Sequence, residues 1–181
     1  MGRIDGYPKP EKWIKRRPAA VAVQLIRELA FRTYNTLAKS LKEVVSNAFD
    51  AGARNVGIIV SDDLRTITID DDGCGMSEDD FESKFLRVSG SDLPDSNPHV
   101  SSRPVIGRLG VGVPTTLKLA EEISVMSKKE RESALIYNHI DTKPVFAPEN
   151  LLKDLDEVLR FDHFSEKAET PSEHYTSIQF S

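Results

Sequence analysis

The chain has 181 residues, enough for one sizeable domain but only for two small ones, and its 39% hydrophobic and 29% charged residues are ordinary for a soluble globular protein. The net charge of −5 argues against broad electrostatic binding to nucleic acid. The single cysteine, Cys74, excludes an intrachain disulfide and a cysteine-rich zinc site. No apolar run resembles a signal peptide or approaches the ~18 residues of a membrane span, so we expect no membrane association and a cytoplasmic location.

The first part of the chain predicts an arm, two helices and a hairpin. Residues 1–18 combine prolines with basic side chains, which predicts an irregular basic arm, either simply solvated or a local patch for a partner or nucleic acid. Apolar residues then recur at helical spacing in two segments, and Gly52 is well placed to end the second. A β-branched run and an alternating run follow, joined by a turn. The predicted elements are helices over 19–32 and 36–51 and strands over 56–60 and 66–69.

The second part of the chain predicts a long loop among strands and short helices. A helix over 77–86 begins with Ser77 as its N-cap, and residues 89–108, rich in Ser, Pro, Asp and Gly, predict a mobile functional loop. The order of elements predicts one α/β domain, a two-layer sandwich with helices on one face of a mixed sheet. The remaining predicted elements are a helix from Gly112 to about Glu121, strands over 123–127 and 134–140, a helix over 150–159 capped by Asn150, and a strand over 175–180.

The helix over 36–51 carries a polar face. At about 100° per residue Glu43, Asn47 and Asp50 share one side, roughly opposite an apolar stripe. This face is either an ordinary solvent face or the wall of a ligand pocket. In a pocket, Glu43 is suited to act as a general base, and Asn47 offers a neutral oxygen to a hard cation. The helix alone does not decide between the two. The apolar stripe comprises Leu41, Val44, Val45 and Ala48.

A loop with the pattern Asp71-x-Gly73-x-Gly75 follows the second predicted strand. A carboxylate at a strand end can accept a hydrogen bond from an exocyclic amine, and glycine lets a flat ring approach the backbone. A β-turn followed by a capped helix explains the same residues without a ligand. Met76 suits apolar contact with a base as well as core packing.

A second glycine pattern, Gly107-x-x-Gly110-x-Gly112, ends the long loop and opens a helix. Backbone N–H groups at a helix N-terminus attract anions, and glycine permits close approach of phosphates. The pattern is not a P-loop, since no Gly-Lys-Ser/Thr follows, and Gly-x-Gly-x-x-Gly is absent. Taken alone it is a weak signal for a phosphate site.

The three patterns in this order resemble the GHKL ATPase superfamily, which takes in gyrase B, Hsp90, histidine kinases, MutL and MORC proteins. They read Glu-x-x-x-Asn-x-x-Asp-Ala, Asp-x-Gly-x-Gly and Gly-x-x-Gly-x-Gly, and they span Glu43 to Gly112. The resemblance is closest to the Hsp90, MutL and MORC branch. It implies the Bergerat ATP-binding fold, an α/β sandwich that binds ATP and Mg²⁺ beneath a mobile lid. We therefore expect residues 19–181 to form an ATP-binding domain, the N-terminal part of a longer protein.

The resemblance also implies roles for particular residues. Glu43 would activate the attacking water, Asn47 would hold Mg²⁺, and Asp50 would help to order the nucleotide site. Asp71 would bind the adenine amino group, with Thr176 of the last strand beneath the adenine. Around the nucleotide, the base pocket would be shaped by Gly73 and Gly75 with Met76, and the lid hinge and phosphate cradle by Gly107, Gly110, Val111 and Gly112.

The sequence departs from the family pattern in its lid. Relatives often carry Ser-Lys or Thr-Lys near the start of the lid, whereas Ser91 is followed here by Asp92. The lid from Ser89 to Ile106 contains no lysine, and Arg103 is its only basic residue. Related proteins complete the γ-phosphate site with a basic residue of a second domain. We therefore expect this chain to be a fragment or an isolated module with slow turnover.

Three functions follow from the resemblance. The first is an ATP-hydrolysing switch in which ATP promotes self-association through a longer parent chain, with any protein client or nucleic-acid partner not legible. The second is the ATP-binding catalytic domain of a histidine kinase, and the third is a scaffold that binds nucleotide without hydrolysis. The histidines form no legible catalytic set and stand in ordinary contexts, at His99, His139, His163 and His174.

Overall fold

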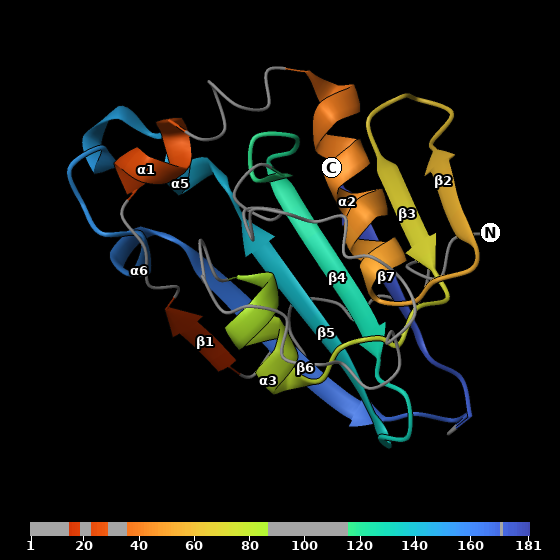
Figure 1. Ribbon diagram of the computed structural model, residues 1–181. Helices are drawn as coiled ribbons and strands as arrows, with labels where there is room; N and C mark the ends of the chain where they lie inside the picture. The colour runs from red at the N-terminus through yellow and green to blue at the C-terminus, as the bar shows by residue number, and fades with distance from the viewer. Residues whose placement is uncertain (1–14, 19–22, 29–35, 87–115, 171) are drawn as a thin grey trace.

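The computed structural model describes residues 15–18, 23–28, 36–86, 116–170 and 172–181. They form one seven-stranded sheet in the order β1-β6-β5-β4-β7-β3-β2 (Figure 1). The strands are β1 (Lys15–Pro18), β2 (Val56–Val60), β3 (Ile67–Asp71), β4 (Glu122–Lys128), β5 (Ala134–Asp141), β6 (Arg160–Lys167) and β7 (Tyr175–Phe180).

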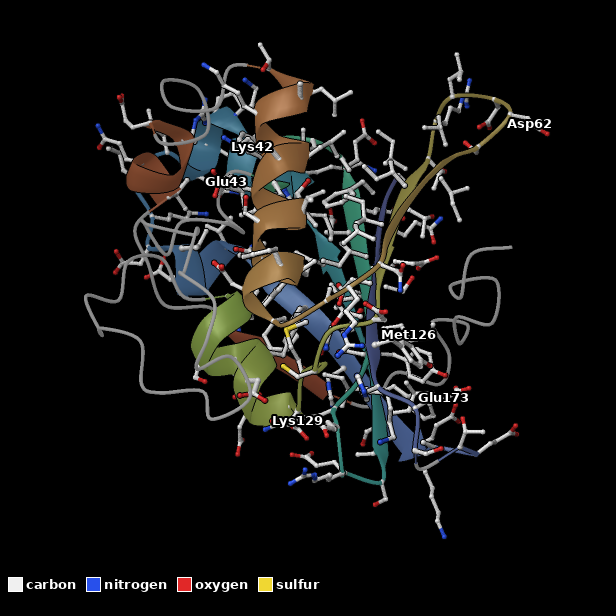
Figure 2. All side chains as sticks on the ribbon, turned by 45° about the vertical axis from the view of Figure 1, so that its right-hand side comes forward. Lys42, Glu43, Asp62, Met126, Lys129 and Glu173 are labelled. Carbon is white, nitrogen blue, oxygen red and sulfur yellow. The ribbon has the colours of Figure 1, made fainter. Side chains whose placement is uncertain are left out.

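Helices cover one face of this sheet, so the predicted two-layer α/β sandwich is confirmed. Figure 2 shows α2 and α3 on the same side of the sheet. The mixed sheet is wrong for the described residues, because every strand pair among them is antiparallel. No described helix is long and apolar enough to cross a membrane. The helical segments are α1 (Val23–Glu28), α2 (Leu37–Asp50), α3 (Glu78–Asp80) with a π-helical turn over Phe81–Phe85, α5 (Lys143–Phe146), a 3-10 turn over Pro148–Asn150, and α6 (Leu155–Val158).

Helix α2 begins and ends where the sequence predicts. The Thr36 side chain caps its N-terminus by accepting from the Lys39 N–H at 3.3 Å. After Ala51, Gly52 takes a left-handed φ of 83°, a conformation that glycine adopts without strain and that ends the helix. The helix therefore presents a fixed face to the sheet.

The hairpin of β2 and β3 follows α2. Its turn is held by Ser61, whose hydroxyl donates to Asp63 Oδ1 at 2.7 Å and accepts from the Thr66 N–H at 3.0 Å. β3 then runs between β2 and β7, one strand in from the edge of the sheet, and ends on Asp71. The hairpin thus delivers the Asp71 carboxyl to the inside of the sandwich, whereas β2 lies at the edge of the sheet.

The core lies between the helices and the sheet. It is built from side chains of both layers, including Val44 of α2, Ile69 of β3 and Phe81 of the π-helical turn, which stacks on Phe85 with ring centroids 4.9 Å apart. A smaller cluster around Met126 and Tyr137 lies apart from it. Figure 2 shows Met126 on the face of the sheet that α2 leaves uncovered.

Three of the predicted elements need correction. Residues 15–18 of the expected irregular arm form β1, which pairs with β6; residues 1–14 lie outside the described residues. Proline at the end of an edge strand is compatible with pairing, since the missing N–H removes no ladder bond. The helix expected to reach Glu121 ends earlier, because residues 117–119 form a turn. The helix over 150–159 is shorter, and α6 begins after Asp154.

The sequence interpretation also missed β6, which is Arg160–Lys167. Its signal is a weak alternation in which Phe161 and His163 are buried while neighbouring residues carry charges. Asn150 was expected to cap a helix; its side chain instead donates to the Pro144 carbonyl at 2.9 Å and accepts from Lys153. The Asn150 side chain therefore stabilises the local turn and does not cap a helix.

Candidate functional site

A pocket opens between α2 and the sheet, beside the ends of β3 and β7. Its empty volume, including the part open to solvent, is about 520 Å³. Its walls are mostly apolar, and a few polar groups converge on it, which is the usual character of a small-molecule site. It is lined by Val44, Asn47, Ala48, Ala51, Asp71, Gly75, Met76, Phe85, Thr116, Thr176, Ile178 and Phe180.

The polar groups of the pocket centre on Asp71 and Thr176. These residues are register partners in the antiparallel β3–β7 pair, so their side chains lie next to each other on the same face of the sheet. Both are buried, with exposed fractions of 9% and 7%. Residues more than a hundred positions apart in the sequence thus form one polar corner in an apolar pocket.

A hydroxyl network holds this corner in place. The fully buried Ser127 of β4 lies with its Oγ 3.0 Å from Thr176 Oγ1, and the same Oγ accepts from the Met76 N–H at 2.8 Å. Ser127 Oγ also donates to the Tyr175 carbonyl at 2.9 Å. With that proton committed, Thr176 donates to Ser127 and turns its lone pairs toward the pocket. The sequence does not predict a role for Ser127, because a serine within a strand carries no pattern of its own.

The Asp71–Gly75 loop is fixed by its own backbone. The Gly73 N–H donates to Asp71 Oδ1 at 2.9 Å, which orients the carboxylate. The Cys74 N–H donates to the Ala51 carbonyl at 2.9 Å, and this bond ties the loop to the end of α2. His174 adds a contact from the chain before β7, with Nδ1 2.7 Å from the Gly73 carbonyl. His174, for which the sequence offered no role, therefore supports the loop.

The chain itself leaves little room for a side chain at Gly73 and none at Gly75. A Cβ on Gly73 would lie 2.8 Å from Asp71 Oδ1 and 3.0 Å from Ala51 Cβ. Gly75 has a φ of +67°, and a Cβ there would lie 2.0 Å from the Lys128 carbonyl oxygen. The predicted reason for glycine was approach by a flat ring; the close approach that the structure shows is between the loop and α2 on one side and β4 on the other.

Asp72 fastens the loop on the other side. Its Oδ1 accepts from the N–H groups of Arg54 and Asn55 at 2.7 and 2.8 Å, and its Oδ2 accepts from Asn55 Nδ2 at 2.8 Å. The bonds from Asn55, followed by that from Arg54, favour the ionised carboxylate and lower the pKa of Asp72 to about 2. The Asp72 carboxylate therefore binds backbone and side-chain groups of the protein, whereas the Asp71 carboxylate lines the pocket.

The structure divides the predicted residues of α2. Asn47 lines the pocket, together with Val44 and Ala48 of the stripe that was expected to lie opposite it. The pocket therefore lies at the border of the polar and apolar faces. Glu43 and Asp50 are half-buried and are not among the residues that line it. Figure 2 shows Glu43 on the side of α2 turned away from the hairpin tip at Asp62.

The donor set fits a nucleotide with Mg²⁺ better than a bare metal ion. Among the described residues, no group of three or more His, Cys, Asp or Glu side chains could hold a metal. Asn47 is exposed beside the pocket and offers one amide oxygen. Mg²⁺ keeps several waters and commonly takes one or two protein ligands plus substrate phosphates, so a single protein oxygen is compatible with such a site.

The structure leaves part of the predicted site untested and adds residues to the rest. Gly107, Gly110, Val111 and Gly112 lie outside the described residues and stay predictions. The structure brings five of the predicted residues together in one pocket, namely Asn47, Asp71, Gly75, Met76 and Thr176. The lining residues that the sequence did not predict are nonpolar apart from Thr116 and look like ordinary core positions in the sequence, namely Val44, Ala48, Ala51, Phe85, Thr116, Ile178 and Phe180.

Comparison with known proteins gives a consistent result. Residues 34–170 match the family model described as histidine kinase-, DNA gyrase B-, and HSP90-like ATPase. The chain is 33% identical over 109 residues to the protein named "Putative type II restriction enzyme HgiDII" of Herpetosiphon aurantiacus, covering 60% of this chain and 18% of that protein.

Two further relatives belong to better-known groups. The DNA mismatch repair protein MutL of Rhizorhabdus wittichii is 35% identical over 85 residues, 46% of this chain and 14% of that protein. The chaperone protein HtpG of Psychromonas ingrahamii is 28% identical over 134 residues, 61% of this chain and 21% of that protein. The chain thus spans about a fifth or less of the length of these relatives.

Proposed function

The chain belongs to the histidine kinase-, DNA gyrase B- and HSP90-like ATPase family, the GHKL superfamily, and on that premise we propose that it binds ATP with Mg²⁺ in the pocket beside α2 and acts as a nucleotide-dependent conformational and dimerisation switch. Membership makes it an ATPase-type domain. Hydrolysis by this chain, the residues that carry it and the switch are the proposal.

The observation that carries the proposal is the buried pair of Asp71 and Thr176 in a mostly apolar pocket. A carboxylate offers only acceptors, so it selects a ring that presents an amino group. The adenine 6-amino group donates to Asp71, and the Thr176 hydroxyl accepts from a second donor or from a bridging water. Met76 and Phe85 also line the pocket and would cover the ring faces by apolar contact.

The phosphates would then lie toward Asn47 of α2. Its amide oxygen would hold Mg²⁺, and the ion would neutralise phosphate charge. Glu43 lies one helical turn before Asn47, so both project from neighbouring positions of one face. In the proposed reaction Glu43 takes a proton from the water that attacks the γ-phosphorus, the bond from that phosphorus to the bridging oxygen breaks, and ADP and phosphate form.

The experiment is a calorimetric titration with a non-hydrolysable ATP analogue and Mg²⁺. Wild-type protein binds, and Asp71→Asn, which places an amide where the adenine amino group needs an acceptor, weakens binding at least ~100-fold. Glu43→Ala serves as the matched control because it leaves the base pocket intact and keeps binding. Absence of binding by the wild-type chain refutes the proposal.

Turnover is tested separately, with ATP and Mg²⁺ as the substrate. Removing the general base lowers hydrolysis by about 10²–10⁴-fold in Glu43→Ala while the analogue still binds. Equal hydrolysis by both proteins shows that Glu43 is not the base. Binding with no hydrolysis in either protein identifies a nucleotide-binding scaffold, and phosphorylation of a histidine from ATP identifies a kinase domain.

A further inference from the structure

One edge of the sheet lacks the features that usually prevent strands from pairing with other chains. β2 is the last strand in the sheet order, and no described strand pairs with its outer side (Figure 1). Its sequence is Val-Gly-Ile-Ile-Val, without charge or proline. Proteins usually protect such edges with lysine, proline or a bulge. β1, at the opposite edge, has the sequence Lys-Arg-Arg-Pro and carries both lysine and proline.

The side chains of β2 are exposed as well as apolar. Ile58, Ile59 and Val60 have exposed fractions of 51%, 40% and 49%. Adjacent residues of a strand point to opposite faces, so apolar surface is exposed on both faces of the edge. An interaction that extends the sheet past β2 would bury both faces at once.

The hydrogen-bond ladder shows which backbone groups of β2 face outward. The Ser61 N–H donates to the Thr66 carbonyl, and the Asp72 N–H donates to the Asn55 carbonyl, so these are hydrogen-bonded pairs of the β2–β3 hairpin. In an antiparallel pair, bonded and non-bonded positions alternate. The positions whose N–H and C=O groups point away from β3 are therefore Val56, Ile58 and Val60.

These outward groups are complementary to a second copy of themselves. An antiparallel β2–β2 pair with its two-fold axis at Ile58 sets Ile58 opposite Ile58 and Val56 opposite Val60. Every outward group within β2 then meets a partner in one register. A two-fold pair of this kind uses the same surface on both copies and closes at two subunits.

The same register also matches charge beyond the ends of the strand. It places Arg54 of one copy opposite Asp62 of the other, and the relation repeats on the other side of the axis. Both residues are exposed, and Figure 2 shows Asp62 at the hairpin tip. Opposite charges directly across an antiparallel pair are stabilising, and like charges are destabilising.

Gly57 adds a third observation. A Cβ on Gly57 would meet nothing closer than the Asp70 carbonyl oxygen at 3.9 Å, so the fold of the single chain does not require glycine there. In the two-fold register Gly57 lies opposite Ile59 of the second copy. A glycine within a strand often marks close approach of another backbone.

We propose that the outer edge of β2 is a homodimer interface, in which two copies of the chain join their sheets through antiparallel pairing of Val56–Val60 with Arg54 set against Asp62. The interface uses neither the nucleotide pocket nor bound ATP. It therefore stands independently of the proposed function and differs from any self-association that ATP promotes.

The first test is sedimentation of the full chain without nucleotide, from about 1 µM to about 500 µM, the range in which small interfaces associate. Wild-type protein forms dimers as concentration rises. Arg54→Asp and Asp62→Arg each bring like charges together and raise the dimer dissociation constant about tenfold. The double variant restores opposite charges and returns it to within about threefold of wild type.

Ile58→Lys should weaken the dimer more than either charge reversal. A lysine at the centre of the pair places two like charges on the two-fold axis, so this variant stays monomeric. Circular dichroism and binding of the ATP analogue confirm that each variant is folded; analogue binding unchanged in the variants separates this interface from the pocket. A monomer at every concentration, or a dimer indifferent to all of these changes, overturns the proposal.

Amide exchange provides a residue-level test. Exchange at Val56, Ile58 and Val60 slows as concentration rises, whereas Gly57 and Ile59, which bond to β3, are protected at every concentration. Protection of the outward amides in a monomer would show that another segment of this chain covers the edge, and it would overturn the proposal.

Discussion

Gly75 is the residue whose identity the fold constrains most directly. Its φ is positive, and an added Cβ would lie 2.0 Å from the backbone carbonyl of Lys128, which cannot move away as a flexible side chain can. The same loop begins with the Asp71 carboxylate. The residue that follows Gly75 is Met76, which donates its N–H to Ser127. Fold and site therefore depend on the same glycine.

We predict that Gly75→Ala lowers the free energy of unfolding by about 3 kcal/mol or more, because it combines a strained backbone with a backbone clash. Urea denaturation measures the change. Gly57→Ala, compared at low protein concentration, is the matched control and changes stability by less than about 1 kcal/mol, since its Cβ meets open space. Equal effects of the two substitutions would contradict this account of Gly75.

Asp72 predicts a pH dependence of stability. Its pKa is about 2 in the folded protein, below the ordinary 3.8, so the folded state favours the ionised carboxylate. The resulting stabilisation is complete above about pH 4 and is lost as pH falls toward 2. Asp72→Asn should cost about 1 kcal/mol at pH 7, with the difference from wild type shrinking below pH 4. Urea midpoints from pH 7 to pH 3 measure it, and a difference that stays constant would refute it.

At the scale of single elements, the short helix α3 depends on its cap. Ser77 Oγ accepts from the Asp80 N–H at 3.2 Å, and Asp80 Oδ2 accepts from the Ser77 N–H at 3.1 Å, a reciprocal capping box. Lys129 joins Asp80 by an ion pair of 2.7 Å, which links the helix to the turn after β4. The element is only three residues long, so its order rests on these contacts.

We predict that Ser77→Ala lowers stability by about 1 kcal/mol and speeds amide exchange in the segment from Glu78 to Phe85. Ser77→Asp keeps an N-cap acceptor and should retain most of the stability, although its charge faces Asp80. Exchange measured by mass spectrometry distinguishes the two variants. Unchanged exchange in Ser77→Ala would show that packing of Phe81 alone holds the segment.

At the scale of the whole molecule, residues of α2, β3 and β7 together line one pocket. A ligand that binds the folded chain and not the unfolded chain raises stability by mass action. With the ATP analogue and Mg²⁺ at 100 times the dissociation constant, we expect an increase in Tm of about 5–10 °C. Removing Mg²⁺ with EDTA should reduce the increase.

Differential scanning fluorimetry measures these shifts, with Asp71→Asn as the control that should show little change. A GTP analogue, which presents a carbonyl where adenine has its amino group, should stabilise less because the Asp71 carboxylate cannot accept from it. Equal stabilisation by both analogues would contradict the assigned role of Asp71 while leaving open a nucleotide site.

Much of the fold and part of the site followed from the sequence, for a physical reason. Thr36, Gly52 and Ser77 act through bonds to residues a few positions away, so the local pattern determined α2 and the start of α3. A β-branched run and an alternating run likewise determined the hairpin, and a strand pattern determined β7. β6 was missed because its alternation is interrupted by charges and becomes decisive only when β5 and β1 pair with it.

The sequence by itself determined which motifs this chain carries, because the spacing of Glu43, Asn47 and Asp71 is a property of the chain. Only the tertiary structure decided how they are used. It set Asp71 against Thr176 across two strands, placed Asn47 beside the apolar stripe, and gave Ser127 and His174 their contacts. Strand register and helix docking depend on contacts between distant residues, and no local pattern encodes those contacts.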